Sequence, residues 1–191
     1  MQKIKIGFFG GSFNPPINTH INLAKNLIKD KIVDKVIFVP VGDYYQKREL
    51  VSAEHRYNML KLACKDYSNI EVENIASSSK NKLFAIDTFG LLYKKYNQES
   101  EMYFIMGSDN FNKMPNWKNY QEIIENYKII VIERKKDTQE ANLKNVIYYK
   151  SSNIEDITST CIRNRLKKNE EVSKYVDEKV DKYIKQNGLY M

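Results

Sequence analysis

FFGGSFNPPINTH, residues 8–20, decides the fold, because it joins an apolar run to an amphipathic segment through a turn of small side chains. Gly10 and Gly11 allow a ligand to approach the backbone closely, and the following pair of prolines stiffens the exit. His20 lies in the expected first helical turn, where unpaired N–H groups and the helix dipole favour an anion. The stretch therefore predicts a strand, a phosphate-binding turn and a helix.

Apolar runs of strand length alternate with segments of helical periodicity along the chain. Strands are expected at residues 4–9, 36–41, 70–75, 102–106, 128–133 and 146–149. Helices are expected at residues 20–29, 53–66, 85–96, 120–126, 159–168 and 172–185. The alternation predicts an α/β fold, a Rossmann-like parallel sheet with helices on both faces. No linker or internal repeat divides it, so we expect a single domain over residues 1–191.

The composition is that of an ordinary globular protein, with 42% apolar residues among 191. Lysine and arginine outnumber aspartate and glutamate by 31 to 24, a charge of +7 that suits an anionic partner. The basic residues are scattered, so we expect anionic nucleotides and no nucleic-acid partner. Cys64 and Cys161 lack the spacing of a zinc site or a disulfide framework, and no apolar run reaches membrane-spanning length. We expect a cytoplasmic protein with no membrane partner.

Ligands of open parallel sheets bind beyond the carboxyl ends of the strands, where this chain carries polar clusters. A second informative segment, DITSTCIRNRL at residues 156–166, places Thr158 and Ser159 at an expected helix start, with Arg163 one turn later. By itself the segment fits an ordinary helix cap equally well. If this helix start and the one at His20 face the same crevice, they form an anion site suited to a triphosphate.

These segments make the chain similar to the nucleotidyltransferase superfamily of adenylyl- and cytidylyltransferases. Residues 10–15 match the family's Gly-Gly-Thr/Ser-Phe-Asp/Asn-Pro loop, and His20 matches the second histidine of its His-x-Gly-His element. Residues 157–160, followed by Arg163, resemble the signature Ile-Ser-Ser-Thr-x-x-Arg.

Internal segments resemble one subfamily in particular, the bacterial nicotinate-nucleotide adenylyltransferases. They are residues 52–60, the pair at 87–88, and Gly107-x-Asp109 leading to Trp117. This resemblance implies transfer of AMP from ATP to nicotinate mononucleotide, which releases pyrophosphate and forms a dinucleotide precursor of NAD. It also implies Mg²⁺ as a cofactor that accompanies ATP.

The resemblance assigns roles to residues as well. His20 is expected to bond the α-phosphate, and Arg163 with the N–H groups of Ser159 and Thr160 is expected to hold the β- and γ-phosphates. Asp109 is expected to accept the ribose hydroxyls. The other residues that the resemblance assigns to ATP binding are Gly10, Gly11, Ser12, Phe13, Gly107, Ile157 and Thr158.

Acceptor contacts are expected at five positions. Trp117 stands where the nicotinate enzymes stack an indole on the pyridine ring, and the alternative for this residue is a core aromatic. A tryptophan in a polar loop that contains proline favours the first assignment. The other candidates are Asn14, Lys47, Thr88 and Arg134, of which Lys47 and Arg134 can equally be solvated.

The family pattern is broken at several positions. Ile17 stands in place of the first histidine of His-x-Gly-His, and Thr19 in place of its glycine. Residues 43–46 and the pair at 84–85 also depart from the nicotinate enzymes. Three interpretations stay open: transfer to nicotinate mononucleotide, adenylyl or cytidylyl transfer to another phosphate-bearing acceptor, and a nucleotide-binding homologue impaired in catalysis. The sequence leaves open whether the chain forms a homo-oligomer.

Overall fold

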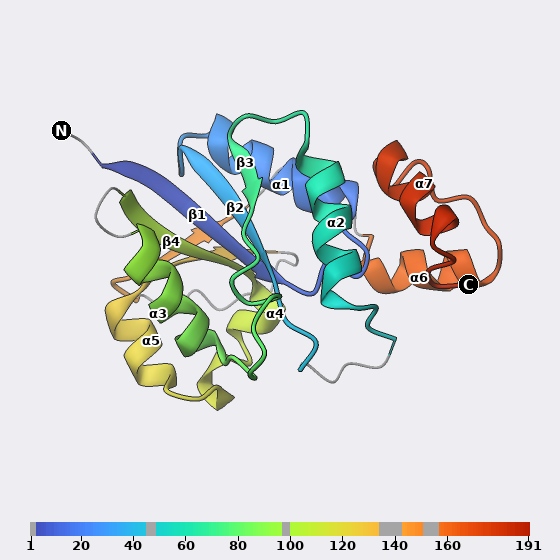
Figure 1. Cartoon of the computed structure of the whole chain (residues 1–191). Coiled ribbons are helices and arrows are strands. Elements are labelled where there is room, and N and C mark those ends of the chain that lie inside the picture. The colour runs from blue at the N-terminus through green and yellow to red at the C-terminus, as the bar shows by residue number, and fades with distance from the viewer. Residues whose placement is uncertain (1–2, 45–48, 97–99, 134–142, 151–156) are drawn as a thin grey trace.

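The computed structural model describes residues 3–44, 49–96, 100–133, 143–150 and 157–191. Within them lies a six-stranded parallel sheet of order β3-β2-β1-β4-β5-β6 (Figure 1). Its strands are β1 (Ile4–Gly11), β2 (Lys35–Pro40), β3 (Ile70–Val72), β4 (Ser100–Gly107), β5 (Lys128–Ile132) and β6 (Val146–Tyr149). The sheet confirms the predicted α/β fold class.

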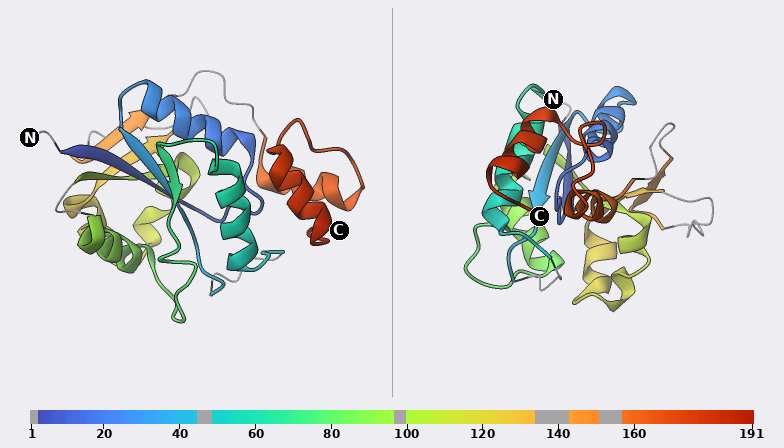
Figure 2. Two further views of the ribbon diagram at one scale, coloured as in Figure 1. Left: turned by 45° about the horizontal axis from the view of Figure 1, so that its top comes forward. Right: turned by 90° about the vertical axis from the view of Figure 1, so that its right-hand side faces the viewer.

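Helices cover both faces of this sheet (Figures 1 and 2). They are α1 (Asn18–Lys29), α2 (Ala53–Cys64), α3 (Ala85–Tyr96), α4 (Ser108–Phe111), the 3₁₀ turn η1 (Met114–Asn116), α5 (Tyr120–Asn126), α6 (Ser159–Lys167) and α7 (Glu178–Gln186). One apolar core joins the sheet to α1 and α2 and includes the buried sides of α6 and α7. The other face carries α3, α4 and α5 over two smaller clusters.

Residues 6–9 of the central strand β1 are apolar without a break because both faces of the strand are buried there. Successive side chains of a strand point to opposite faces, so Phe9 enters the α1 and α2 core while Phe8 packs under α3. Both faces are covered here, as is usual for parallel sheets, and the one charged residue of β1, Lys5, lies near its start. β1 pairs with β2 on one side and with β4 on the other. The order of the strands therefore reverses at β1, which creates a crevice at its carboxyl end.

Most predicted elements are present with ends within two or three residues, and one helix is corrected. The helix expected at residues 172–185 begins only at Glu178. Val172 and Val176 are buried in turns that precede it, and the Asp177 side chain caps α7 by accepting the Lys179 N–H at 2.8 Å. The short elements α4 and η1 were not expected.

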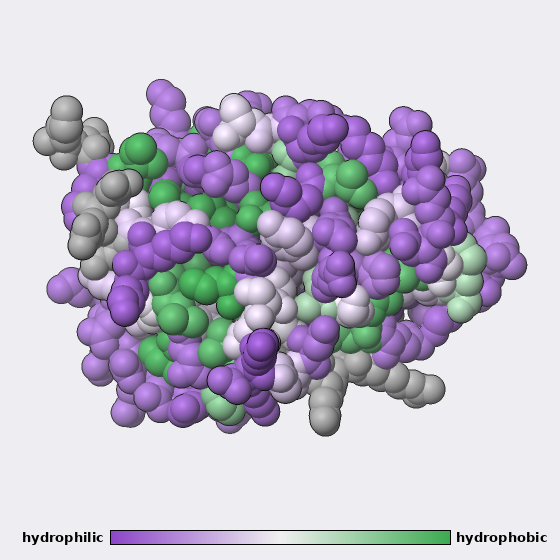
Figure 3. Space-filling view, viewed as in Figure 1, coloured by the Kyte–Doolittle hydropathy of each residue, from purple (hydrophilic) through white to green (hydrophobic). Residues whose placement is uncertain are grey.

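The surface is mostly hydrophilic on the face seen in Figure 3. Apolar side chains over α3, where Leu91 is 41% exposed, lie among hydrophilic ones. Within the described residues, we find no helix with the length and apolar character that crossing a bilayer requires.

Candidate active site

A cavity of about 290 Å³ lies at the carboxyl ends of β1 and β4, where the strand order reverses. Three separate segments of the chain contribute most of its wall: the β1–α1 loop, the start of α4 and the first turn of α6. The lining residues are Phe9, Gly10, Gly11, Ser12, Phe13, Asn14, His20, Leu50, Gly107, Asp109, Asn110, Ser159, Thr160 and Arg163. His20 and Arg163, the two residues expected to contact the phosphates, therefore share one cavity.

The β1–α1 loop is built from small residues around one buried ring. No atom lies within 4 Å of the place where a Cβ on Gly10 would stand, so a ligand can approach this backbone. A Cβ on Gly11 would lie 2.8 Å from the Phe13 ring. Phe13 is buried with a φ of 48°, and its ring packs edge-on against His20 at 5.1 Å between centroids. The loop thus exposes backbone while its aromatic ring fixes the imidazole.

His20 is the third residue of α1, and the helix start orients its ring. The Ile17 N–H donates to His20 Nδ1 at 3.1 Å, which is the reach-back half of a capping box. Because Nδ1 accepts this bond, the neutral imidazole carries its proton on Nε2. The side chain is 9% exposed and borders the cavity. The ring is therefore held in the tautomer that can donate from Nε2.

Ile17, which replaces the family's first histidine, has a structural place in this chain. Its side chain is 3% exposed and belongs to the main apolar core, and it does not line the cavity. The residue contributes to the site through its backbone, which positions His20. Thr19, in place of the family's glycine, is likewise buried and absent from the cavity wall.

The first turn of α6 is tied to the β1–α1 loop. Thr158 is the N-cap, and its Oγ1 accepts the Cys161 N–H at 3.2 Å. Ser159 Oγ donates to the Pro15 carbonyl at 2.8 Å, across 144 positions of sequence. Ser159 and the exposed Thr160 both line the cavity. The helix start therefore faces the glycine loop, as the sequence interpretation required.

Arg163 is fixed in the wall by groups from two loops and its own helix. It donates to the Asn14 carbonyl at 2.9 Å and to Thr160 Oγ1 at 3.2 Å. Its buried Nε lies 3.5 Å from Glu49 Oε2 and has no hydrogen-bond partner among the described residues. Glu49 also pairs with Lys167, and these two cations keep the pKa of the Glu49 carboxyl below its ordinary value. The site thus contains a largely buried guanidinium beside the exposed carboxylate of Glu49.

The structure brings together only part of the predicted set. Asp109 is exposed at the start of α4 and lines the cavity beside Gly107. Two residues expected at ATP do not line it: Ile157 packs against the apolar core, and the Thr158 hydroxyl serves the helix cap. Asn14 is the one described acceptor candidate in the wall.

The other acceptor candidates lie elsewhere. Trp117 directly follows η1 and packs against the cluster under α5, while Thr88 is half-buried in α3. Neither borders the cavity. Lys47 and Arg134 lie outside the described residues.

Arg56 is a functional candidate that sequence reasoning missed. Its side chain is fully buried, and it donates to the Val51 carbonyl at 2.9 Å and the Ser12 carbonyl at 3.1 Å. A third contact, at 3.1 Å, pairs it with Asp43. Burial lowers the pKa of the Arg56 guanidinium, and Asp43 opposes that shift. The available signal was an arginine at helical spacing from Met59 and Leu60, which are buried on α2.

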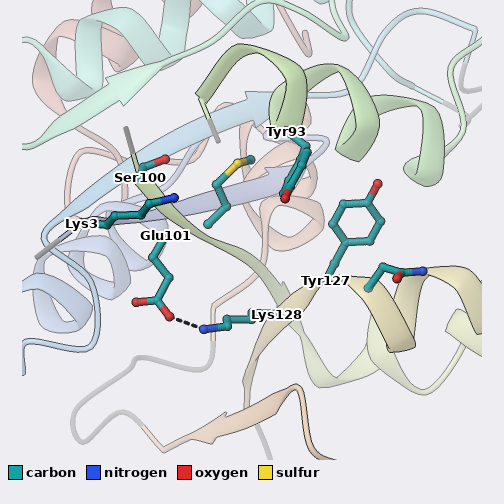
Figure 4. A pocket seen from close by; sticks show the side chains of 8 residues that line it. Lys3, Tyr93, Ser100, Glu101, Tyr127 and Lys128 are labelled. Carbon is teal, nitrogen blue, oxygen red and sulfur yellow. Dashed lines mark hydrogen bonds and ion pairs between the residues drawn. The ribbon is translucent and has the colours of Figure 1, made fainter. Parts of the chain in front are cut away.

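Another hollow, of about 430 Å³, lies at the amino ends of β4 and β5, opposite the carboxyl ends that border the first cavity (Figure 4). It is lined at the start of β4 and β5 by residues that include Glu101 and Lys128, which form an ion pair across it. Its described lining contains no glycine and no helix start, unlike that of the first cavity, which we therefore take as the candidate site.

Comparisons with known proteins show which family the chain resembles. The family model described as cytidylyltransferase-like matches residues 8–165. A protein of Acholeplasma laidlawii is 32% identical over 186 residues, covering 95% of each chain, and one of Fusobacterium nucleatum is 32% identical over 97% of this chain and its own full length. Both carry the name "Probable nicotinate-nucleotide adenylyltransferase".

A solved structure shares the fold. The nicotinic acid mononucleotide adenylyltransferase of Plasmodium falciparum, complexed with NaAD, superposes with a TM-score of 0.82 at 23% identity, covering 98% of this chain and 97% of its own. A second structure of that enzyme, complexed with APC, gives a TM-score of 0.80. Since a family model spans most of the sequence and relatives of nearly equal length share a third of its residues, this chain belongs to the cytidylyltransferase-like family of nucleotidyltransferases, in its nicotinate-nucleotide adenylyltransferase group.

Proposed function

We propose that this chain transfers AMP from ATP to the phosphate of nicotinate mononucleotide, forming nicotinate adenine dinucleotide and pyrophosphate. The observation that carries the proposal is one cavity at the strand-order reversal, lined by His20, Arg163 and an open glycine backbone. The named relatives, similar over nearly their whole length, support this choice of acceptor. Residues 1–191 would act as a single nucleotidyltransferase domain.

The reaction brings several negative charges together, so its catalysis depends on positioning and charge stabilisation. An oxygen of the acceptor phosphate attacks the α-phosphorus of ATP, and the bond from that phosphorus to the bridging oxygen breaks as pyrophosphate leaves. His20, with its proton on Nε2, is the proposed donor to the α-phosphate oxygens as their charge grows. Arg163 and the N–H groups at the start of α6 are proposed to hold the β- and γ-phosphates.

Nucleotidyltransferases of this family generally use a divalent metal, and we propose that here it is Mg²⁺. The described residues contain no group of three or more His, Cys, Asp or Glu side chains that could hold an ion. Asp109, the residue expected at the ribose hydroxyls, is the only carboxylate among the described lining residues. A single carboxylate fits an ion that would be carried in by ATP better than one resident in the protein. When bound, the ion neutralises phosphate charge.

A second candidate function is AMP transfer to another phosphate-bearing acceptor. Two residues that the resemblance assigned to the acceptor, Trp117 and Thr88, do not border the cavity. The described cavity wall therefore has no indole to stack on a pyridine ring, and this observation favours the second candidate.

The test is release of pyrophosphate by the purified protein with Mg²⁺, ATP and nicotinate mononucleotide. We expect turnover that His20→Ala lowers about a hundredfold, because one donor to the developing charge is lost. His55→Ala is the matched control, since the other histidine of the chain bonds Tyr183 at 3.0 Å and does not line the cavity. It is expected to retain wild-type turnover.

Parallel reactions contain CTP in place of ATP, or other phosphate-bearing acceptors in place of nicotinate mononucleotide. Turnover with a different acceptor alone supports the second candidate. Absence of pyrophosphate from every combination contradicts both and leaves the nucleotide-binding homologue.

A further inference from the structure

The Asn14 side chain is a hub that joins three parts of the chain. Its Oδ1 accepts the Tyr190 hydroxyl at 2.7 Å and the Val51 N–H at 3.3 Å. Its Nδ2 donates to the Glu49 carbonyl at 2.8 Å, while its own carbonyl accepts from Arg163. Asn14 is 5% exposed, so these bonds are made away from bulk water. The amide oxygen is fully used by protein donors, which suits a structural link better than a ligand contact.

Several residues with unfavourable backbone angles lie next to Asn14 or bond its side chain. Six non-glycine residues among those described have positive φ: Phe13, Lys31, Glu49, Asn119, Asn169 and Tyr190. Three of them surround Asn14, because Phe13 precedes it, Glu49 accepts from it and Tyr190 donates to it. Left-handed backbone is unfavourable for bulky side chains and persists where the surroundings impose it, most often at functional sites.

Tyr190 comes from the last residues of the chain, 176 positions after Asn14. It follows α7, and its side chain is buried in the main core, near Arg56 and Arg163. Burial raises the pKa of the Tyr190 phenol, so the hydroxyl stays a donor across the physiological range. The C-terminal segment therefore contacts the β1–α1 loop through Asn14, and the same loop lines the cavity.

We propose that Tyr190 is a positioning residue for the active site: its hydroxyl fixes the Asn14 amide and thereby sets the β1–α1 loop and Arg163 for phosphate transfer. The inference rests on the proposed function for its kinetic consequence. Its structural part, the link from the C-terminus to the loop, is independent of which acceptor is used.

The test compares Tyr190→Phe with Tyr183→Phe. Both substitutions remove one hydroxyl from the C-terminal region and keep the ring. Tyr183 is a matched control because its hydroxyl joins α7 to His55 and Asn58 of α2, with no contact to the loop. The readouts are kcat, the KM for each substrate, the melting temperature and the amide spectrum of Val51, whose N–H shares Asn14 Oδ1.

We expect Tyr190→Phe to lower kcat about tenfold, because small misplacements of catalytic groups are costly in the transition state. Its KM for ATP should stay within about threefold, as binding energy in the ground state is less sensitive to alignment. The Val51 amide should shift in Tyr190→Phe and remain unchanged in Tyr183→Phe.

Equal kcat for both variants, or an unmoved Val51 amide in Tyr190→Phe, overturns the inference even if the melting temperature falls. A wild-type protein without turnover on nicotinate mononucleotide contradicts the proposed function separately. In that case kcat is measured with the acceptor that does react. If none reacts, the Val51 amide decides the structural part, and the inference then requires it to shift in Tyr190→Phe and not in Tyr183→Phe.

Discussion

Arg56 shows how a single buried charge can organise loops that a sequence pattern leaves undefined. Its guanidinium reaches the carbonyls of Ser12 and Val51 and the carboxylate of Asp43. These partners lie in the loops after β1 and β2. The guanidinium of arginine spreads five N–H donors over a planar fork and can reach acceptors in separate loops, whereas the three donors of lysine all radiate from one nitrogen. Arg56 therefore fixes the back of the glycine loop without touching the cavity.

Arg56→Lys is expected to lower the free energy of unfolding by about 3 kcal/mol, because a buried cation loses part of its partners. Urea denaturation followed by circular dichroism measures the change. The control is Arg165→Lys, whose guanidinium is partly exposed and 3.4 Å from Glu170, and we expect a much smaller change there because solvent screens this pair. Equal effects at the two positions would show that Arg56 is not an anchor.

Among the helices and strands, the sequence periodicity predicted those elements that pack one of their own faces against the sheet. The β1 run and the four-residue spacing of α1 are examples, because both are packed against the sheet. The helix expected at residues 172–185 was wrong at its start because Val172 and Val176 reach the core from turns, which mimics helical spacing. The Asp177 cap was the local signal that could have corrected it.

The features of the candidate site likewise fall into those that a local motif predicts and those that depend on tertiary packing. The two helix starts that meet at the cavity could be predicted because each has its own local motif. The contacts of Tyr190 and Glu49 with Asn14 could not, since they join positions 176 and 35 residues apart and depend on how the elements pack. The absence of Trp117 from the cavity wall has the same cause, because its packing under α5 is tertiary.

The contact of Glu73, just after β3, with the end of α3 should make the free energy of unfolding depend on pH. Glu73 follows β3, and its Oε2 accepts from Lys95 Nζ at 2.5 Å and from the Tyr96 hydroxyl at 2.7 Å, at the end of α3. Burial by itself would raise the pKa of Glu73, but these hydrogen bonds outweigh it and leave that pKa below its ordinary value of 4.5. A lowered folded pKa means that the stabilisation is present above the unfolded pKa and is lost as pH falls.

Glu73→Gln should therefore reduce the free energy of unfolding by about 1 kcal/mol at pH 7, a modest value because solvent around the half-exposed Lys95 screens the pair. The difference should shrink as the pH drops below about 4.5, where the unfolded wild-type carboxyl is protonated. Denaturation curves at pH 7 and pH 3.5 measure it, with Glu71→Gln as the control for an exposed pair with Lys35. A difference that is the same at both pH values would rule out this ion-pair origin.

In the molecule as a whole, residues near the C-terminus bond the loop that follows the first strand. The first turn of α6 bonds Pro15, Arg163 bonds Asn14, and Tyr190 reaches Asn14 from the last residues. Figures 1 and 2 show α6 and α7 at the end of the molecule opposite the N-terminus, beyond the carboxyl end of β1. The cavity consequently depends on segments from the start, middle and end of the sequence, so correct closure of the whole fold is a condition for binding.

Hydrogen–deuterium exchange of the wild-type protein, with and without ATP and Mg²⁺, tests most directly whether two distant segments hold one triphosphate. The account predicts slower amide exchange on binding both in the β1–α1 loop at residues 10–14 and in the first turn of α6 at residues 159–162. The hollow at the opposite edge, at residues 100–102 and 126–128, should be unchanged and serves as the internal control. Protection of only one of the two segments, or of neither while ATP is bound, would contradict the account.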